Sequence, residues 1–242
     1  VLHTPVGFYK EAPMYVLTVE GIARDGRAAA SWSFAEVVNV DDLRRFSQSA
    51  VFSEGRAVFR VPAGRYSISG FIVTRDEIGS DRELAFVSQP EVEVQGDMTV
   101  VLDARPATRI EIETPQAAEA QWFSLGYYRR SLARGLIISS TAVWGMNGQV
   151  YTVPTSPVSA GEFEFYSEHM LTSPPGTDEP YIYRLSFPEP GGIEGPLRYV
   201  VGDNAPVATV ETVYHSHDWR WQAEARHFWT PDGRGIVVIR AP

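Results

Sequence analysis

The sequence has 242 residues, of which 30 are acidic and 21 basic, giving a formal net charge of −9 at pH 7. This balance argues against nucleic acid or an anionic membrane as the main partner, because both are bound through basic patches. A content of 44% hydrophobic and 12% aromatic residues excludes a disordered chain, and the absence of cysteine excludes disulfides, thiolate metal sites and cysteine nucleophiles.

In the first part of the chain, the local patterns are mostly those of β-strands. Residues 14–22 alternate apolar and polar side chains, residues 24–27 (RDGR) form a turn, and residues 28–40 contain the return strand of a hairpin. Residues 41–49 (DDLRRFSQS) are typical either of a short capped helix or of a loop. The pattern at this point leaves both open.

The clearest signal is residues 55–73, GRAVFRVPAGRYSISGFIV, in which two alternating runs are interrupted by Pro-Ala-Gly. Pro62 fixes φ, and Gly64 supplies the backbone freedom that a tight turn needs. Gly70, inside the second run, indicates a bulge or a close backbone contact. We therefore predict a hairpin that serves as framework and carries no reactive group.

Further strands are predicted at residues 80–95 and 98–104, with a Gly-Asp turn between them, and this spacing of short strands is typical of a β-sandwich. A second alternating series starts at residues 108–115, directly after Arg105-Pro106, where we place a domain boundary. Further strands in the second half are predicted near 121–129, 134–144, 149–153, 161–168, 179–187, 196–201, 206–221 and 235–240. The predicted fold is all-β, with two tandem β-sandwich domains covering residues 1–105 and 106–242.

Two observations bear on where the protein works. No apolar run approaches the roughly 20 residues that a membrane helix needs, so we expect no membrane insertion. The chain begins at Val1 rather than Met, without a basic or an apolar leader, so we expect a segment upstream of it.

Six segments follow one another in a recognisable order: GRAVFRVPAGRYSISGFIV (55–73), MTVVLDAR (98–105), TRIEIETP (108–115), GYYRR (126–130), PYIYRLSFPEPGGI (180–193) and VETVYHSH (210–217). Together they resemble the accessory β region of large secreted subtilisin-like serine proteases from actinobacteria. The first half alone also resembles the transthyretin-like, carboxypeptidase-regulatory-like domains attached to many secreted enzymes. The resemblance covers roughly residues 14–217, and only the order of its loose strand-and-turn motifs makes it specific.

The resemblance implies a secreted, extracellular protein whose partner is the catalytic protease domain of the same parent chain. The Gly-Thr-Ser-Met-Ala setting of a subtilisin nucleophile and its Asp and His motifs do not occur in this sequence. We therefore expect no catalytic residue and no cofactor in this chain, and a role in stability, substrate positioning or attachment. The alternative is a free-standing extracellular β-sandwich protein that binds carbohydrate or cell wall.

The strongest candidate for chemistry is the pair His215 and His217, which share one face of a strand at a spacing used by metal ligands. A closed zinc site needs four ligands, so His169 or His227 would have to approach. Without that approach, the two histidines are ordinary surface residues. We do not expect a metal site.

Tryptophans near the C-terminus are a candidate platform for polysaccharide. Trp219, Trp221 and Trp229 could stack on sugar rings, although aromatic side chains of this size also fill sandwich cores. Because Trp219 and Trp221 share a strand face, both should be exposed or both buried.

An independent hydrolase is the third possibility. The sequence has no Gly-x-Ser-x-Gly elbow to expose a serine nucleophile. Carboxylate pairs occur at Asp41 and Asp42 and at Glu162 and Glu164, but solvated strand faces explain them without glycoside hydrolysis. No Asp-x-Asp-x-Asp-Gly calcium loop is present.

Overall fold

The computed structural model describes residues 13–75, 81–133, 137–144, 148–202, 224–229 and 235–240. In this part of the chain the regular structure is all β-strand, which confirms the predicted all-β class. The described residues hold no helix of the length and apolar character that a membrane span requires. The chain divides into two compact units, Val1–Val201 and Gly202–Pro242.

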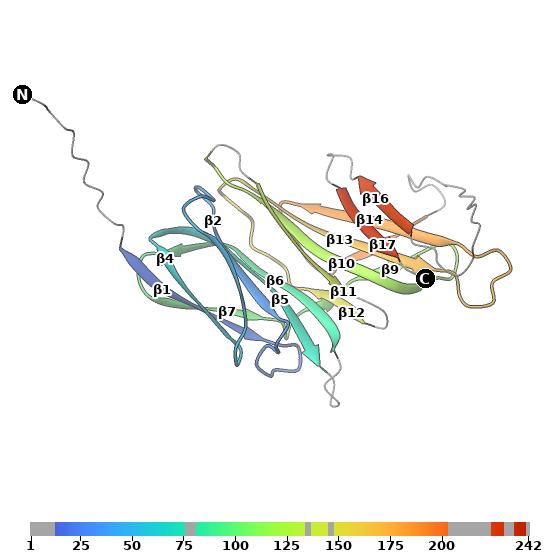
Figure 1. Ribbon diagram of the computed structural model, residues 1–242, viewed down its shortest axis with the longest axis horizontal. Coiled ribbons are helices and arrows are strands. Elements are labelled where there is room, and N and C mark those ends of the chain that lie inside the picture. Colours follow the sequence, from blue (N-terminus) through green and yellow to red (C-terminus); the bar gives the residue numbers. More distant parts are fainter. Residues whose placement is uncertain are drawn as a thin grey trace, which may run out of the picture. The chain divides into compact units, whose positions relative to one another are not determined.

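The strands of the first unit form three larger sheets and a two-stranded ribbon (Figure 1). The three-stranded sheet has the order β4 (Arg56–Pro62), β1 (Met14–Ile22), β7 (Met98–Asp103). The six-stranded sheet has the order β3 (Ser47–Val51), β2 (Phe34–Asn39), β5 (Gly64–Arg75), β6 (Asp81–Val94), β12 (Gln149–Thr152), β8 (Thr108–Arg109). The four-stranded sheet has the order β11 (Ile137–Trp144), β10 (Glu119–Arg130), β13 (Glu162–Thr172), β14 (Ile182–Pro190). The ribbon pairs β9 (Glu111–Glu113) in parallel with β15 (Arg198–Val200).

The second unit contains one antiparallel hairpin, formed by β16 (Glu224–Trp229) and β17 (Gly235–Arg240). The strand predicted at residues 235–240 is confirmed, and β16 was not predicted. The strand predicted at residues 206–221 lies outside the described residues.

Residues 55–73 form two strands as predicted, but the predicted hairpin between them is wrong. β4 pairs with β1 in the three-stranded sheet, whereas β5 pairs with β2 and β6 in the six-stranded sheet. The chain crosses from one sheet to the other at Gly64, where a Cβ atom would lie 2.7 Å from Asn39 Nδ2. Alternation therefore identified the strands, and the Pro-Ala-Gly segment makes a corner rather than a hairpin turn.

Other predicted neighbours are separated in the same way. β1 and β2 lie in different sheets, and only the isolated bridge between Ile22 and Ala28 joins the two sides of the predicted hairpin. β7 pairs in parallel with β1 instead of returning along β6. Residues 41–49 contain a turn and the start of β3, so of the two alternatives the helix is excluded. At Gly70 the crowding comes from a side chain rather than a backbone, because a Cβ atom there would lie 2.7 Å from Leu102 Cδ1.

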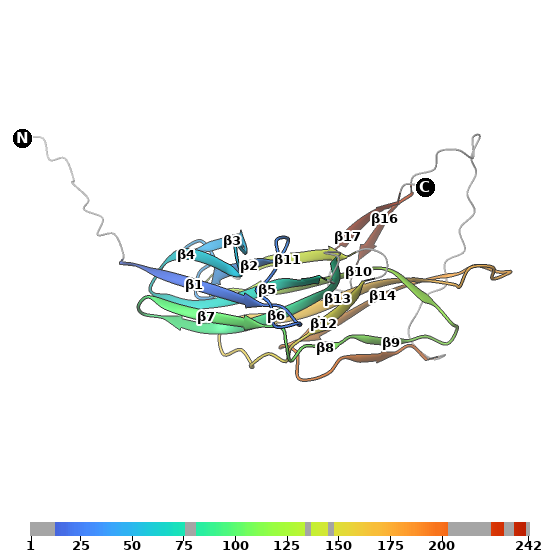
Figure 2. The same ribbon diagram turned by 90° about the horizontal axis from the view of Figure 1, so that it is seen from below.

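Two hydrophobic clusters show that the six-stranded sheet is the middle layer of the first unit (Figure 2). Along β5, Ile68 and Ile72 belong to the first cluster, whereas Phe71 and Val73 belong to the second. This separation follows from the period of two in a strand. The first cluster adds side chains of the three-stranded sheet, including Leu17, Val19, Phe59, Val61 and Leu102. The second adds side chains of the four-stranded sheet, including Phe123, Leu125, Tyr127, Phe163 and Phe165.

The second cluster and the six-stranded sheet both include residues from the two predicted halves. β12 pairs in parallel with β6, and Phe86 of β6 packs against Phe165 of β13 with ring centroids 5.1 Å apart. The boundary between residues 105 and 106 stays a prediction. These contacts show that residues of both predicted halves form the interface between the middle and four-stranded sheets.

Candidate functional site

Most of the aromatic and histidine residues singled out in the sequence lie outside the described part of the chain. This holds for His215, His217, Trp219 and Trp221, whereas Trp229 is the last residue of β16. Within the described ranges, no group of three or more His, Cys, Asp or Glu side chains is arranged to hold a metal ion.

Arginines bind most of the predicted carboxylate candidates. Asp41 accepts a hydrogen bond of 2.6 Å from Arg65 Nη2, and Arg130 Nε donates to Glu162 over 2.9 Å. Hydrogen bonds from Arg44, which outweigh a small effect of burial, lower the pKa of Asp42 to about 2. Each of these carboxylates is therefore in a charged pair and is not arranged with its neighbour as an acid–base couple.

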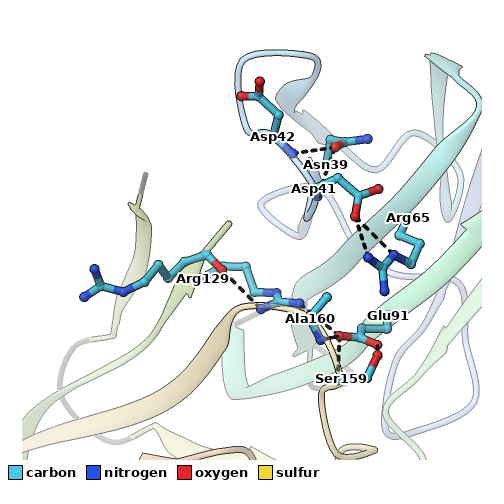
Figure 3. A network of polar contacts seen from close by, with 9 residues as sticks. Asn39, Asp41, Asp42, Arg65, Glu91, Arg129, Ser159 and Ala160 are labelled. Carbon is cyan, nitrogen blue, oxygen red and sulfur yellow. Dashed lines mark hydrogen bonds and ion pairs between the residues drawn. The ribbon is translucent and has the colours of Figure 1, made fainter. Parts of the chain in front are cut away.

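The most buried charge of the described residues is Arg129, which points from β10 into the space between the four-stranded and six-stranded sheets. Its side chain is fully buried. Nη1 donates to the carbonyl oxygen of Glu162 over 2.9 Å. Nη2 lies 3.4 Å from Glu91 Oε1, on the facing sheet (Figure 3). Burial lowers the pKa of Arg129, and the charge of Glu91 opposes this shift. A buried guanidinium is costly unless it is paired, so these contacts decide whether it is tolerated.

Glu91, on β6, is the other half of this pair and also holds the segment before β13 (Figure 3). It accepts hydrogen bonds from Ser159 N at 2.7 Å, Ser159 Oγ at 2.6 Å and Ala160 N at 2.5 Å. Burial opposes ionisation of Glu91, but these hydrogen bonds and the charge of Arg129 outweigh it and lower the pKa of Glu91. The carboxylate therefore stays ionised and is a poor proton acceptor.

Gly161 allows the segment to approach β10. Its φ is +65°, and a Cβ atom there would lie 2.0 Å from the carbonyl oxygen of Arg130 and 3.3 Å from Arg129 Nη1. Only glycine fits this close approach without displacing the backbone. We call Glu91, Arg129, Ser159, Ala160 and Gly161 the Arg129 cluster.

A second polar link joins the same two sheets. Tyr127, fully buried on β10, donates its hydroxyl to Glu36 Oε2 on β2 over 2.9 Å. Beside it, the hydroxyls of Ser69 and Ser88 share a buried hydrogen bond of 2.8 Å. Burial, reinforced by the negative charge of Glu36, raises the pKa of Tyr127, so the phenol remains a neutral donor.

The chemistry of this site is structural. Glu91 already receives four donors, and the Arg129 guanidinium is enclosed between the sheets. The arrangement provides no activated nucleophile and no free base, and it connects β6, β10 and the segment before β13 through charge-assisted hydrogen bonds.

The cluster could have been found in part from the sequence. In GYYRR, an inward Tyr127 requires an inward Arg129 and outward Tyr128 and Arg130, because strand side chains alternate. Its partners had no sequence signal, since Ser159 lies 68 residues beyond Glu91 in the chain.

Trp32 was also missed. Its side chain is 74% exposed and its φ is +83°, at the third position of a turn closed by a 3.0 Å hydrogen bond from Ser33 N to the carbonyl oxygen of Ala30. Glycine usually occupies that position in a turn of this type, so no local pattern indicated a turn with Trp32 there.

Two adjacent residues of β13, Glu168 and His169, are buried ionisable groups outside the cluster. Desolvation raises the pKa of Glu168 to about 7 and lowers the pKa of His169 to about 4. His169 lies between the rings of Phe123 and Phe187, at centroid distances of 6.4 and 6.0 Å. Within the described residues, its Nε2 is buried and has no hydrogen-bond partner.

These shifts predict opposite pH dependences. Below its ordinary pKa of 6.5, His169 is protonated in the unfolded chain but stays neutral in the fold down to about pH 4, so it lowers stability as the pH falls. Above its ordinary pKa of 4.5, Glu168 is ionised in the unfolded chain but stays protonated in the fold up to about pH 7, so it lowers stability as the pH rises. Each group lowers stability by at most about 3 kcal/mol, and because the two pH slopes are opposite, we expect them to cancel between these limits.

Single variants separate the two effects in urea denaturation from pH 4 to 7.5. In Glu168→Gln, the free energy of unfolding should rise with pH between 4 and 6.5, while in His169→Phe it should fall between 4.5 and 7. Parallel pH profiles for the two variants would contradict the assignment.

No protein-family model and no curated protein matches the chain. Among solved structures, the match to a candidate adhesin from Bacteroides ovatus ATCC 8483 covers 87% of this chain and 100% of the adhesin chain, with 9% identity and a TM-score of 0.30. The match to the Bacillus anthracis TIE protein covers 95% of this chain and 43% of the TIE chain, with 12% identity and a TM-score of 0.27. The match to a streptococcal ancillary pilin covers 78% of this chain and 61% of the pilin chain, with 12% identity and a TM-score of 0.26. TM-scores of this size support no inference about function.

Proposed function

We propose that this chain is a non-catalytic framework region of a secreted protein and acts outside the cell, in attachment or in positioning a neighbouring domain. The Arg129 cluster is the observation that carries this proposal. Its buried charges are occupied in joining two sheets, where an enzyme would leave an acid, base or nucleophile open to substrate.

The arrangement of the sheets supports a mechanical role. The middle sheet is covered by a hydrophobic cluster on each face, and Arg129 with Glu91 and Tyr127 with Glu36 connect it to the four-stranded sheet. A unit held in this way should resist local opening, because opening would expose unpaired charges and apolar surface together. Such resistance suits a protein exposed to proteases.

We further propose that the neighbouring domain is the catalytic domain of a subtilisin-like serine protease in the same parent chain. Support comes from the sequence resemblance, whose segments GYYRR and PYIYRLSFPEPGGI contribute to β10 and β14, the two strands that pair with β13. In this arrangement the present chain provides stability or substrate positioning, and the catalytic residues belong to the other domain.

Peptide mapping of the native protein from culture medium tests the proposal, combined with a serine-reactive phosphonate label and a heat-denatured control. We expect a peptide that runs from subtilisin-like sequence through Val1, and phosphonate only on the upstream domain. A native chain that begins at Val1 would remove the protease link. A phosphonate adduct on a serine of this chain, absent from the denatured control, would overturn the non-catalytic assignment.

A further inference from the structure

β3 forms one edge of the six-stranded sheet. Among the described strands it pairs with β2 alone, in a register that places Ala35 opposite Ala50 and Val37 opposite Gln48. The same ladder includes hydrogen bonds from Asn39 N to the carbonyl oxygen of Phe46 and from Phe52 N to that of Ser33. Even-numbered residues of this segment therefore direct their backbone groups toward β2.

The odd-numbered residues Ser47, Ser49 and Val51 consequently direct their N–H and C=O groups away from the sheet. Within the described ranges, none of these groups has a hydrogen-bond partner. Their side chains are exposed, that of Val51 by 67%. β3 thus presents a row of donors and acceptors with which no described strand pairs.

β3 also lacks the features that normally protect an edge strand, namely charged side chains and proline. Its sequence, SQSAV, is uncharged. By contrast, the edge strand β4 carries Arg56, Arg60 and Pro62, and the edge strand β14 carries Pro188 and Pro190. On β7, the Gln89 side chain donates to the carbonyl oxygen of Val101 over 3.0 Å.

The charges that flank β3 differ between its two ends. Exposed Arg44 and Arg45 precede the strand, Arg44 already paired with Asp42, and exposed Glu54 follows it. If a second β3 lies antiparallel with Ser49 opposite Ser49, the arginine end of each copy lies beside the Glu54 end of the other. In this register Ser47 faces Val51, so all three outward-directed residues of each strand find partners.

We propose that two copies of this chain pair through β3, edge to edge and antiparallel, around a two-fold axis at Ser49. The pairing adds about six backbone hydrogen bonds, two for each hydrogen-bonded residue pair. It joins two six-stranded sheets into one continuous sheet. The contact is small, so the dimer should be weak and should dissociate on dilution. The proposal is independent of whether the parent protein is a protease.

Sedimentation velocity of the full chain from roughly 10 µM to 1 mM, the range where a small interface is expected to associate, tests the proposal. Ser49→Pro removes the outward N–H at the two-fold axis without removing a hydrogen bond to β2, because proline is tolerated at such an edge position. We expect its dimer dissociation constant to rise at least tenfold. The matched control, Ser49→Ala, keeps the N–H and should stay within about twofold of the parent value.

Charge variants give a second measurement that does not depend on proline. Glu54→Arg should weaken the dimer several-fold, because like charges then face one another. Combining it with Arg45→Glu, one residue from the position opposite residue 54 in this register, should recover part of the lost affinity. A monomer at every concentration overturns the proposal, as does a dimer that neither Ser49→Pro nor Glu54→Arg weakens. Equal losses in Ser49→Pro and Ser49→Ala would overturn it as well, since the contact would then not depend on the backbone.

Discussion

Replacing Arg129 with alanine is expected to lower the free energy of unfolding by about 3–5 kcal/mol. The variant removes the hydrogen bond to the carbonyl oxygen of Glu162 and the ion pair with Glu91, and it opens a cavity between the sheets. Glu91 keeps its donors from Ser159 and Ala160, so the variant should still fold. Urea denaturation at pH 7, followed by tryptophan fluorescence and circular dichroism, measures the change.

Arg130 offers a matched control, since it is the next residue of the same strand and has the same chemistry. Its side chain is 44% exposed and pairs with Glu162, which is 73% exposed. Exposed ion pairs contribute roughly 0–1 kcal/mol, so Arg130→Ala should change stability little. Equal losses in the two variants would contradict the assignment of Arg129 as the residue that joins the sheets.

Arg129→Met separates charge from packing. Methionine fills much of the arginine volume but cannot donate to Glu162 or balance Glu91. If the hydrogen bonds dominate, Arg129→Met should be nearly as destabilising as Arg129→Ala. If Arg129→Met leaves the free energy of unfolding almost unchanged, then the buried volume matters and the charge does not, as occurs for some buried ion pairs.

The sequence predicted most strands but not which strands pair. The alternation in residues 55–73 puts Ala57, Phe59 and Val61 on one face of a strand, and the fold buries all three. A period of two shows which side chains turn inward, but two strands with the same pattern can pair with one another or lie in facing sheets. Here β4 and β5 lie in different sheets, and their inward side chains meet in the first hydrophobic cluster.

The candidate site was harder to predict, because its partners come from separate parts of the chain. Alternation in β10 is sufficient to place Arg129 inward beside Tyr127. No local pattern, however, indicates that Glu91 receives the backbone N–H groups of Ser159 and Ala160. These contacts depend on how the four-stranded sheet packs on β6. Sequence reasoning favoured paired carboxylates and histidines, because these residue types are known for their reactivity. The Arg129 cluster instead uses its charges to hold sheets together.

Replacing Gly161 with alanine should destabilise the fold by more than about 3 kcal/mol, because two separate costs add. The φ of +65° is unfavourable for an L-residue with a Cβ atom, which accounts for about 1 kcal/mol. The larger cost is steric. The Cβ atom would lie 2.0 Å from the carbonyl oxygen of Arg130, a backbone atom that cannot rotate away. The segment would have to move from β10, and the Ser159 and Ala160 donors would move away from Glu91.

Gly176→Ala isolates the first cost. Gly176 also has a positive φ, of +85°, but a Cβ atom there meets nothing within 4 Å. Gly176→Ala should therefore lower the free energy of unfolding by only about 1 kcal/mol. The difference between the two glycine variants in urea denaturation then measures the steric cost of the close approach at Gly161. Native-state hydrogen exchange adds a local readout, since the Ser159 and Ala160 amides should lose protection in Gly161→Ala and keep it in Gly176→Ala. If both variants lost the same stability and kept these amides protected, the segment would not be held against β10. Glu91 would then stabilise Arg129 alone, and the Arg129 cluster would reduce to one ion pair.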